Sequence, residues 1–169
     1  MAEIRDAKSD DAGEICTIYN YYISNTVISF EETPVTIEEM QKRITSVQSG
    51  NLPWLVYVEN NAVIGYAYAS KWQQRSAYRY SVECSVYLKQ DVVGNGIGSS
   101  LYSELFRRLR TLKYHAVIGG IALPNAASVA LHEKFGFEKA AHYKETGYKF
   151  GQWIDVGYWE LLLREENEP

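Results

Sequence analysis

One stretch of the sequence, residues 81–101 (SVECSVYLKQDVVGNGIGSSL), changes its hydrophobic period in the middle and constrains the fold more than any other. Its first eight residues alternate between apolar and polar at the period of two expected of a strand. From Ile97 onward, the apolar residues recur at three- and four-residue steps, as on one face of a helix. Gly94, Gly96 and Gly98 lie between these two parts, so the chain is expected to turn sharply into the helix. Amide groups at such a helix N-terminus bind anions, and a nucleotide-like pyrophosphate is the expected ligand.

The glycine turn by itself does not specify a function. A strand-to-helix turn that needs glycine only for its backbone dihedral angles has the same appearance. The spacing differs from the G-x-G-x-x-G of dinucleotide-binding folds, and no Lys-Ser or Lys-Thr follows the last glycine, as a Walker A loop requires. Anion binding therefore needs support from other motifs.

The composition predicts one ordinary globular domain over residues 1–169. A mass of 19.3 kDa allows a real core, and 46% hydrophobic with 22% charged residues argues against disorder. The formal net charge of −4 and the lack of a dense Lys and Arg run give no support for nucleic-acid binding. Cys16 and Cys84 lack metal-ligand spacing, and no His, Cys or carboxylate cluster in the sequence indicates a metal site.

The apolar runs are too short for a membrane segment. The N-terminal residues MAEIRDAKSDD contain no signal-like apolar run, and no segment approaches the roughly 18 apolar residues of a membrane span. We therefore expect a cytoplasmic protein without a membrane partner.

The hydrophobic periods and the capping residues predict a mixed α/β sheet with helices on both faces, because strands and helices alternate without a strict βαβ order. Helix starts are expected at Ser9 to Asp11, at the Thr36 and Glu39 capping box, after the glycine turn and at Asn125. The acidic tail at residues 165–169 is expected to be frayed. Strands are expected at residues 2–5, 52–59, 63–72, 81–88, 115–121, 137–149 and 152–163. A tight hairpin turn is expected at Asn60-Asn61, and a bend near Gly147 and Gly151 between the last two strands.

Three motifs taken together, VGNGIGSSL (93–101), NAAS (125–128) and LHEKFGF (131–137), resemble the GCN5-related N-acetyltransferases (GNAT). The resemblance narrows to the branch that acetylates phosphinothricin, methionine sulfone and methionine sulfoximine, and it runs over nearly the whole chain. The segments that carry the narrower resemblance are 29–31, 65–67, 82–87, 114–116, 125–128 and 149–155.

The resemblance implies a mixed, mostly antiparallel sheet whose fourth strand is bulged and splayed from the fifth, so that the pantetheine arm of acetyl-CoA can pair with exposed backbone. One departure concerns Val93, because the family turn usually begins with Arg or Gln; acetyl-CoA binding is expected to be weaker, not lost. By the same matching, the residues that contact acetyl-CoA are Val86, Tyr87, Leu88, Gly94, Asn95, Gly96, Ile97, Gly98, Ser99, Asn125 and Lys134.

Amine acetylation needs a base for the ammonium proton, and Glu83 is the candidate, although an ordinary outward-facing strand acid has the same pattern. Amides near residues 86–88 are expected donors to the oxyanion. His132 is the candidate acid for the leaving thiolate, with a packed, hydrogen-bonded histidine as the alternative.

An amino-acid substrate carries a carboxylate, which a guanidinium grips in a bidentate manner. Arg75 and Arg79 precede the candidate base and are the expected clamp, while Phe30 is expected to wall the pocket or simply to pack. Matching to the family branch completes the expected substrate-binding set with Gln73, Gln74, Glu83, Cys84 and Ser85.

These observations predict transfer of an acetyl group from acetyl-CoA to the α-amine of a small amino acid. Acetylation of a protein N-terminus or another small amine, and a non-catalytic acyl-CoA sensor, remain as alternatives. The resemblance also implies a homodimer, with the aromatic C-terminal strands, including Trp153, Tyr158 and Trp159, as the expected contact surface.

Overall fold

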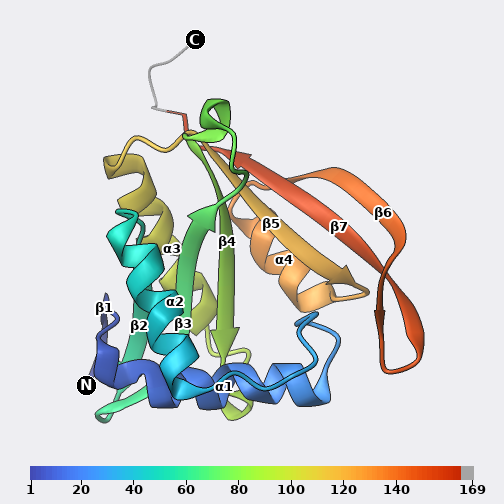
Figure 1. Cartoon of the computed structure of the whole chain (residues 1–169). Coiled ribbons are helices and arrows are strands. Elements are labelled where there is room, and N and C mark those ends of the chain that lie inside the picture. Colours follow the sequence, from blue (N-terminus) through green and yellow to red (C-terminus); the bar gives the residue numbers. More distant parts are fainter. Residues whose placement is uncertain (165–169) are drawn as a thin grey trace.

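The computed structural model describes residues 1–164 and contains a seven-stranded sheet in the order β1-β2-β3-β4-β5-β7-β6 (Figure 1). Only β4 and β5 are parallel neighbours among these strands; the other adjacent pairs are antiparallel. The predicted mixed, mostly antiparallel sheet is therefore confirmed. The strands are β1 (Ala2–Asp6), β2 (Trp54–Glu59), β3 (Ala62–Lys71), β4 (Ser81–Leu88), β5 (Ala116–Leu123), β6 (Glu138–Lys149) and β7 (Gln152–Leu162).

Helices cover both faces of the sheet, as expected. α1 (Ala12–Asn25) and α2 (Ile37–Ser49) pack on one face, and α3 (Ile97–Thr111) and α4 (Ala126–Lys134) on the other (Figure 1). Each face has its own buried cluster. The cluster under α3 includes five leucine and aromatic positions of that helix, Leu101, Tyr102, Leu105, Phe106 and Leu109.

Two of the expected helix caps are present as side-chain hydrogen bonds. Thr36 Oγ1 accepts from the Glu39 amide at 3.1 Å, and Asn125 Oδ1 accepts from the Ser128 amide at 3.1 Å. Residues 9–11 form a 3₁₀ turn before α1 instead of a side-chain cap. The Asp11 carboxylate accepts from Arg5 at 2.7 and 2.9 Å and from the Lys8 amide at 2.7 Å, so it holds the turn to β1.

The predicted hairpin turns are also present. Asn60 and Asn61 join β2 to β3 with φ values of 51° and 63°, and Phe150 and Gly151 join β6 to β7 with φ values of 50° and 74°. Asparagine and glycine tolerate this left-handed region better than other residues.

β4 and β5 separate after a short paired segment. Their parallel pairing covers only Ser81 to Glu83 against Ala116 to Ile118, yet β4 continues to Leu88 and β5 to Leu123. Figure 1 shows the two strands diverging toward the end at which β4 finishes. The predicted splay is thus confirmed.

The predicted bulge in β4 is not found in its ladder with β3. That register is unbroken from Lys71 opposite Val82 to Gly65 opposite Leu88. The strands separate because β4 and β5 diverge after their short paired segment, not because an extra residue is inserted into β4.

Within residues 1–164, no helix is long and apolar enough to cross a membrane. The same residues contain no group of three or more His, Cys, Asp and Glu side chains placed to hold a metal ion. The tail at 165–169, which was expected to be frayed, lies outside the described residues.

Candidate active site

A narrow cavity of about 60 Å³ lies where β4 and β5 separate. Six residues singled out from the sequence line it: Cys84, Ser85, Val86, Tyr87, Asn125 and His132. They come from β4 and from the start and end of α4, and the fold brings them together across the splay. The remaining lining residues are Ile28, Tyr102, Gly120, Ile121, Ala122 and Ser128.

The hydrogen-bond register of β4 decides which backbone groups face this gap. The Lys89 amide donates to Ile64 O, and Ser81 O accepts from the Trp72 amide, so odd-numbered residues of β4 bond toward β3. The amide and carbonyl groups of Val86 and Leu88 therefore point toward β5. The main chain of Tyr87 bonds toward β3, although the residue itself lines the cavity.

Side chains of the neighbouring helix restrict this edge further. Tyr22 Oη donates to Leu88 O at 2.6 Å, so that carbonyl already has a partner. The Tyr87 ring packs edge-on against Tyr19 and Tyr22 of α1. The backbone edge left for an extended ligand therefore consists mainly of Val86 and the Leu88 amide.

The glycine turn leads directly into α3. Gly94 and Gly96 have φ values of 92° and 79°, and a Cβ on either would meet no atom within 4 Å. Glycine is needed at both for its backbone conformation, and the space above them is open. The Ser100 amide donates to Gly96 O at 3.0 Å, whereas the preceding amides belong to the helix end that has no intrahelical acceptor.

The third glycine of the turn has ordinary helical backbone and faces α4. Gly98 lies inside α3 without a positive φ, and a Cβ there would lie 3.5 Å from Leu131 Cδ2 on α4. At the same meeting of helices, Lys134 Nζ donates to Ser99 Oγ at 3.0 Å. Ser99 and Lys134, both singled out from the sequence, are thus brought together beside the open turn.

Glu83 occupies the last position at which β4 pairs with β5, and it is half-buried. Burial raises the pKa of its carboxyl group above the usual glutamate value. The Glu83 carboxylate lies against β5 at Gly120, which has no side chain. A Cβ placed on Gly120 would be 3.4 Å from Glu83 Oε1. No residue among 1–164 hydrogen-bonds or ion-pairs with this carboxylate, which leaves it free to accept a proton.

His132 is buried, with 3% of its surface exposed, and both ring nitrogens are engaged. Nδ1 donates to Ser128 O at 2.7 Å, so Nε2 of the neutral ring accepts from the Tyr102 hydroxyl at 3.2 Å. Burial lowers the pKa of His132. The ring lies over Gly119, where a Cβ would approach Nε2 to 2.5 Å.

The Tyr102 hydroxyl lies beside two groups of the cavity wall. It hydrogen-bonds to His132 Nε2 and stands near the Cys84 thiol, whose pKa burial raises to about 12. A tyrosine at an apolar helical position carried no sequence signal for this role. The contact between Tyr102 and His132 is visible only once α3 packs against α4 in the folded structure.

The expected carboxylate clamp lies apart from Glu83. Arg75 and Arg79 are exposed at a 3₁₀ turn (Ser76–Tyr78) before β4, and Gln73 and Gln74 are exposed beside them. The Arg79 guanidinium donates to Ser76 O at 3.2 Å and lies 4.7 Å above the Tyr80 ring. Neither arginine contacts the Glu83 carboxylate.

The C-terminal aromatic residues divide between core and surface. Trp159, expected at a contact surface, is instead buried, because odd-numbered side chains of this part of β7 face α4; its Nε1 donates to Glu133 at 3.4 Å. Tyr158 is half-buried and packs over Gly120. Trp153 is exposed, as predicted for a contact surface.

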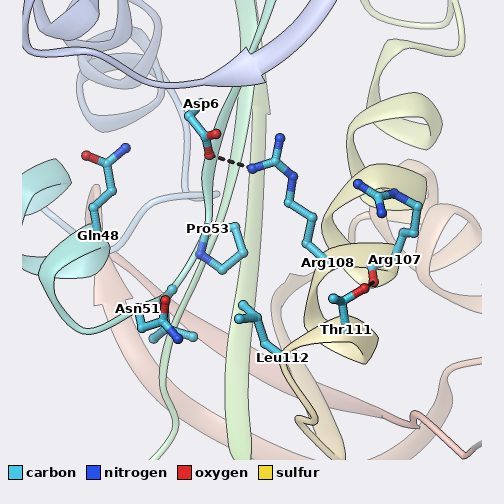
Figure 2. Close-up of a pocket in the computed structure, with 9 residues that line it drawn as sticks. Asp6, Gln48, Asn51, Pro53, Arg107, Arg108, Thr111 and Leu112 are labelled. Carbon is cyan, nitrogen blue, oxygen red and sulfur yellow. Dashed lines mark hydrogen bonds and ion pairs between the residues drawn. The ribbon is translucent and has the colours of Figure 1, made fainter.

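A larger hollow of about 450 Å³ lies away from these residues, between the end of α2 and the end of α3 (Figure 2). Its charged groups are paired with each other: Arg108 Nη1 lies 2.6 Å from Asp6 Oδ1, and Glu104 pairs with Arg107 and Arg108. None of the residues singled out from the sequence lines it, and we assign it no part in the reaction.

Known proteins resemble this chain over almost its full length. The model of the acetyltransferase (GNAT) domain matches residues 4–157. A phosphinothricin N-acetyltransferase of Streptomyces viridochromogenes is 37% identical over 158 residues, which cover 94% of this chain and 86% of that protein. An L-methionine sulfoximine/L-methionine sulfone acetyltransferase of Pseudomonas aeruginosa is 36% identical over 163 residues, which cover 96% and 95%.

Solved structures of acetyltransferases also resemble this chain over most of its length. A phosphinothricin acetyltransferase from Sinorhizobium meliloti, in complex with acetyl-CoA, superposes with a TM-score of 0.92 at 39% identity and covers 95% of this chain and 88% of its own. An acetyltransferase from Salmonella typhimurium with its cofactor acetyl-CoA has a TM-score of 0.94 at 34% identity, covering 99% and 97%.

Proposed function

This chain belongs to the acetyltransferase (GNAT) domain family, and from that membership we propose that it acetylates the α-amine of a small amino acid of the methionine sulfone, methionine sulfoximine or phosphinothricin type. It is an acetyl-CoA-dependent N-acetyltransferase, as its relatives are. The observation that carries the proposal within this structure is the placement of Glu83, which is half-buried, unpaired and located where β4 and β5 separate.

The residues present fit acetyl-CoA, which supplies the acetyl group as a thioester. The amides of the open turn at 94–99 suit a pyrophosphate, because they stand at the N-terminus of a fifteen-residue helix. Lys134 adds a positive charge beside Ser99. Val86 and the Leu88 amide provide an unpaired strand edge, which suits an extended amide-containing arm.

Glu83 is proposed as the general base. Its carboxylate takes a proton from the substrate ammonium, directly or through a water, and its raised pKa brings it closer to the working pH than an ordinary glutamate. The amide of Val86 faces the gap and is the proposed donor to the oxygen that gains charge in the reaction.

His132 is proposed to act through Tyr102 on the leaving sulfur. The Tyr102 hydroxyl bonds to His132 Nε2 and both residues line the cavity, so the proposed route brings a proton to the sulfur from the Tyr102 oxygen. For this step His132 first takes up a proton from solvent at Nε2, because its resting ring is neutral. It then passes that proton to Tyr102 and returns to the neutral form, which burial favours by lowering its pKa.

Arg75 or Arg79 is proposed to bind the substrate carboxylate, with Phe30, Gln73, Gln74, Cys84 and Ser85 around the remaining substrate. Both guanidinium groups are exposed, and no carboxylate among residues 1–164 pairs with them, so they are open to an incoming acid. Loss of binding in Arg79→Ala but not in Lys71→Ala, measured as the KM of the amino acid, tests this assignment.

We also propose that the protein is a cytoplasmic homodimer. Four exposed aromatic side chains lie along the β6–β7 hairpin, and such rings are enriched at interfaces. Both cysteines are free, which fits a reducing compartment. Sedimentation of the wild type against Trp153→Arg checks the assembly. The four residues are Tyr143, Tyr148, Phe150 and Trp153.

The function is tested by release of free thiol from acetyl-CoA with a panel of amines. The panel holds L-methionine sulfone, L-methionine sulfoximine, phosphinothricin, their carboxyl esters and short peptides. We expect turnover with the free amino acids and a loss of at least about 100-fold in rate in Glu83→Gln. Turnover confined to peptides would reject the substrate class, and acetyl-CoA binding without any turnover would indicate a sensor.

A further inference from the structure

The loop between α1 and α2, residues 26–36, reaches both the cavity and the far edge of the sheet. Ile28 lines the cavity between β4 and β5, and Phe30 packs on β6. Ser29 lies between them and is buried. The position of this one residue therefore determines where both apolar side chains stand.

Lys149, at the end of β6, holds Ser29 in place. Its side chain is buried, with 2% of the residue exposed, and Nζ donates to Ser29 O at 2.6 Å. An ammonium group is costly to bury, and burial lowers the pKa of Lys149, although nearby Glu31 and Glu32 oppose the shift. Because Lys149 Nζ donates to the Ser29 carbonyl, the buried ammonium group holds the loop in place.

Gly147, two residues earlier on β6, accommodates the Phe30 ring. A Cβ at Gly147 would lie 2.5 Å from Phe30 Cε2 and Cζ, closer than any real contact. The ring thus lies directly on the backbone of β6. A larger residue at this position would push Phe30, and the loop with it, away from the strand.

The other side of the loop is tied to the helices. Arg43 of α2 grips both oxygens of Glu31 at 2.8 and 2.7 Å. Tyr19 of α1 hydrogen-bonds Ser29 Oγ at 3.0 Å and also the Glu31 carboxylate. The loop is therefore fixed from the helix layer by Arg43 and Tyr19, and from the sheet by Lys149.

We propose that Lys149 is a positioning residue for amine recognition, which sets the wall formed by Ile28 and Phe30 through the Ser29 carbonyl. The inference rests on the proposed function, because it assigns that wall to the amine side of the site. Lys149 takes no part in the chemistry or in acetyl-CoA binding. Its loss loosens the loop and changes which amines bind, and by how much.

The first test replaces Lys149 by methionine, which keeps the length of the side chain and suits a buried position. Lys144→Met is the matched control, since Lys144 is exposed on the same strand. We expect the KM of the preferred amino acid to rise at least about tenfold, the effect of losing a hydrogen bond to a charged group. The acetyl-CoA dissociation constant and kcat should stay within about twofold of wild type.

A second pair of variants tests the wall itself. Gly147→Ala should raise the amine KM, because the new methyl group displaces Phe30. In a Phe30→Ala background the same change should have no further effect, since the ring is gone. Equal KM values in Lys149→Met and Lys144→Met, or an unchanged effect of Gly147→Ala without the ring, would overturn the proposal.

Hydrogen exchange of amides 26–36, measured without either substrate, separates this inference from the proposed function. Faster exchange in Lys149→Met, but not in Lys144→Met, supports the positioning contact even if no amine on the panel is turned over. Unchanged exchange overturns it even if the enzyme acetylates the expected amino acids. Faster exchange with an unchanged amine KM in an active enzyme also overturns it.

Discussion

Replacing Tyr102 by phenylalanine removes one oxygen from the centre of the site and leaves the ring packing in place. The hydroxyl is buried, bonds to His132 Nε2 at 3.2 Å and stands near the Cys84 thiol. The variant therefore leaves Nε2 of His132, a residue only 3% exposed, without its hydrogen-bond donor. The cost is that of an unsatisfied buried group, not the small net value of a hydrogen bond.

The expected loss of unfolding free energy is about 1 to 3 kcal/mol, the usual penalty for a buried polar atom left unpaired. For a domain of this size, each kcal/mol lowers Tm by about 2 to 4 °C, so a fall of roughly 2 to 12 °C is expected. Tyr148→Phe is the control, because Tyr148 is 57% exposed and should change stability by less than about 0.5 kcal/mol.

Urea unfolding followed by tryptophan fluorescence measures both variants. A double-mutant cycle with His132→Leu isolates the coupling, because removal of both polar partners is far less costly than removal of one. The penalty for Tyr102→Phe should therefore shrink by at least about 0.5 kcal/mol in the His132→Leu background. Equal stability of Tyr102→Phe and Tyr148→Phe, or full additivity in the cycle, would refute the hydrogen-bonded link and with it the proton route through Tyr102.

Three further outcomes are expected. Val93→Arg should lower the acetyl-CoA dissociation constant about tenfold or more in calorimetry, since a charged hydrogen bond contributes about 1.5 to 3 kcal/mol; unchanged affinity would show that the backbone of the turn suffices. Because burial raises the pKa of Glu83, wild-type stability should fall as pH rises from the ordinary glutamate pKa through the raised one. Glu83→Gln should therefore be more stable than wild type at neutral pH and lose that advantage in acid, as urea titrations at several pH values can show. Asp6→Asn, which breaks a surface pair with Arg108, should cost less than about 1 kcal/mol and leave both KM values unchanged.

Local patterns in the sequence predicted the elements well. The Thr36 and Asn125 caps, the Asn60 turn and the period change around the glycine turn each act over three to five residues, within reach of local physics. The resemblance added the site, and the splayed strands place six of the expected residues around one cavity. The bulge expected in β4 and the surface position expected of Trp159 were not found, because both depend on how whole strands pair and twist.

The sequence by itself determined the order of elements, the open glycine turn and the acid at position 83, because each follows from residue type and spacing along the chain. The tertiary structure decided the links between distant residues: Tyr102 with His132, and Lys149 with Ser29, separated by 30 and 120 positions. Such contacts arise only when helices and strands pack, since burial selects partners by distance in space. The residues that position the site, and Tyr102 on the proposed proton route, are therefore invisible to any local pattern.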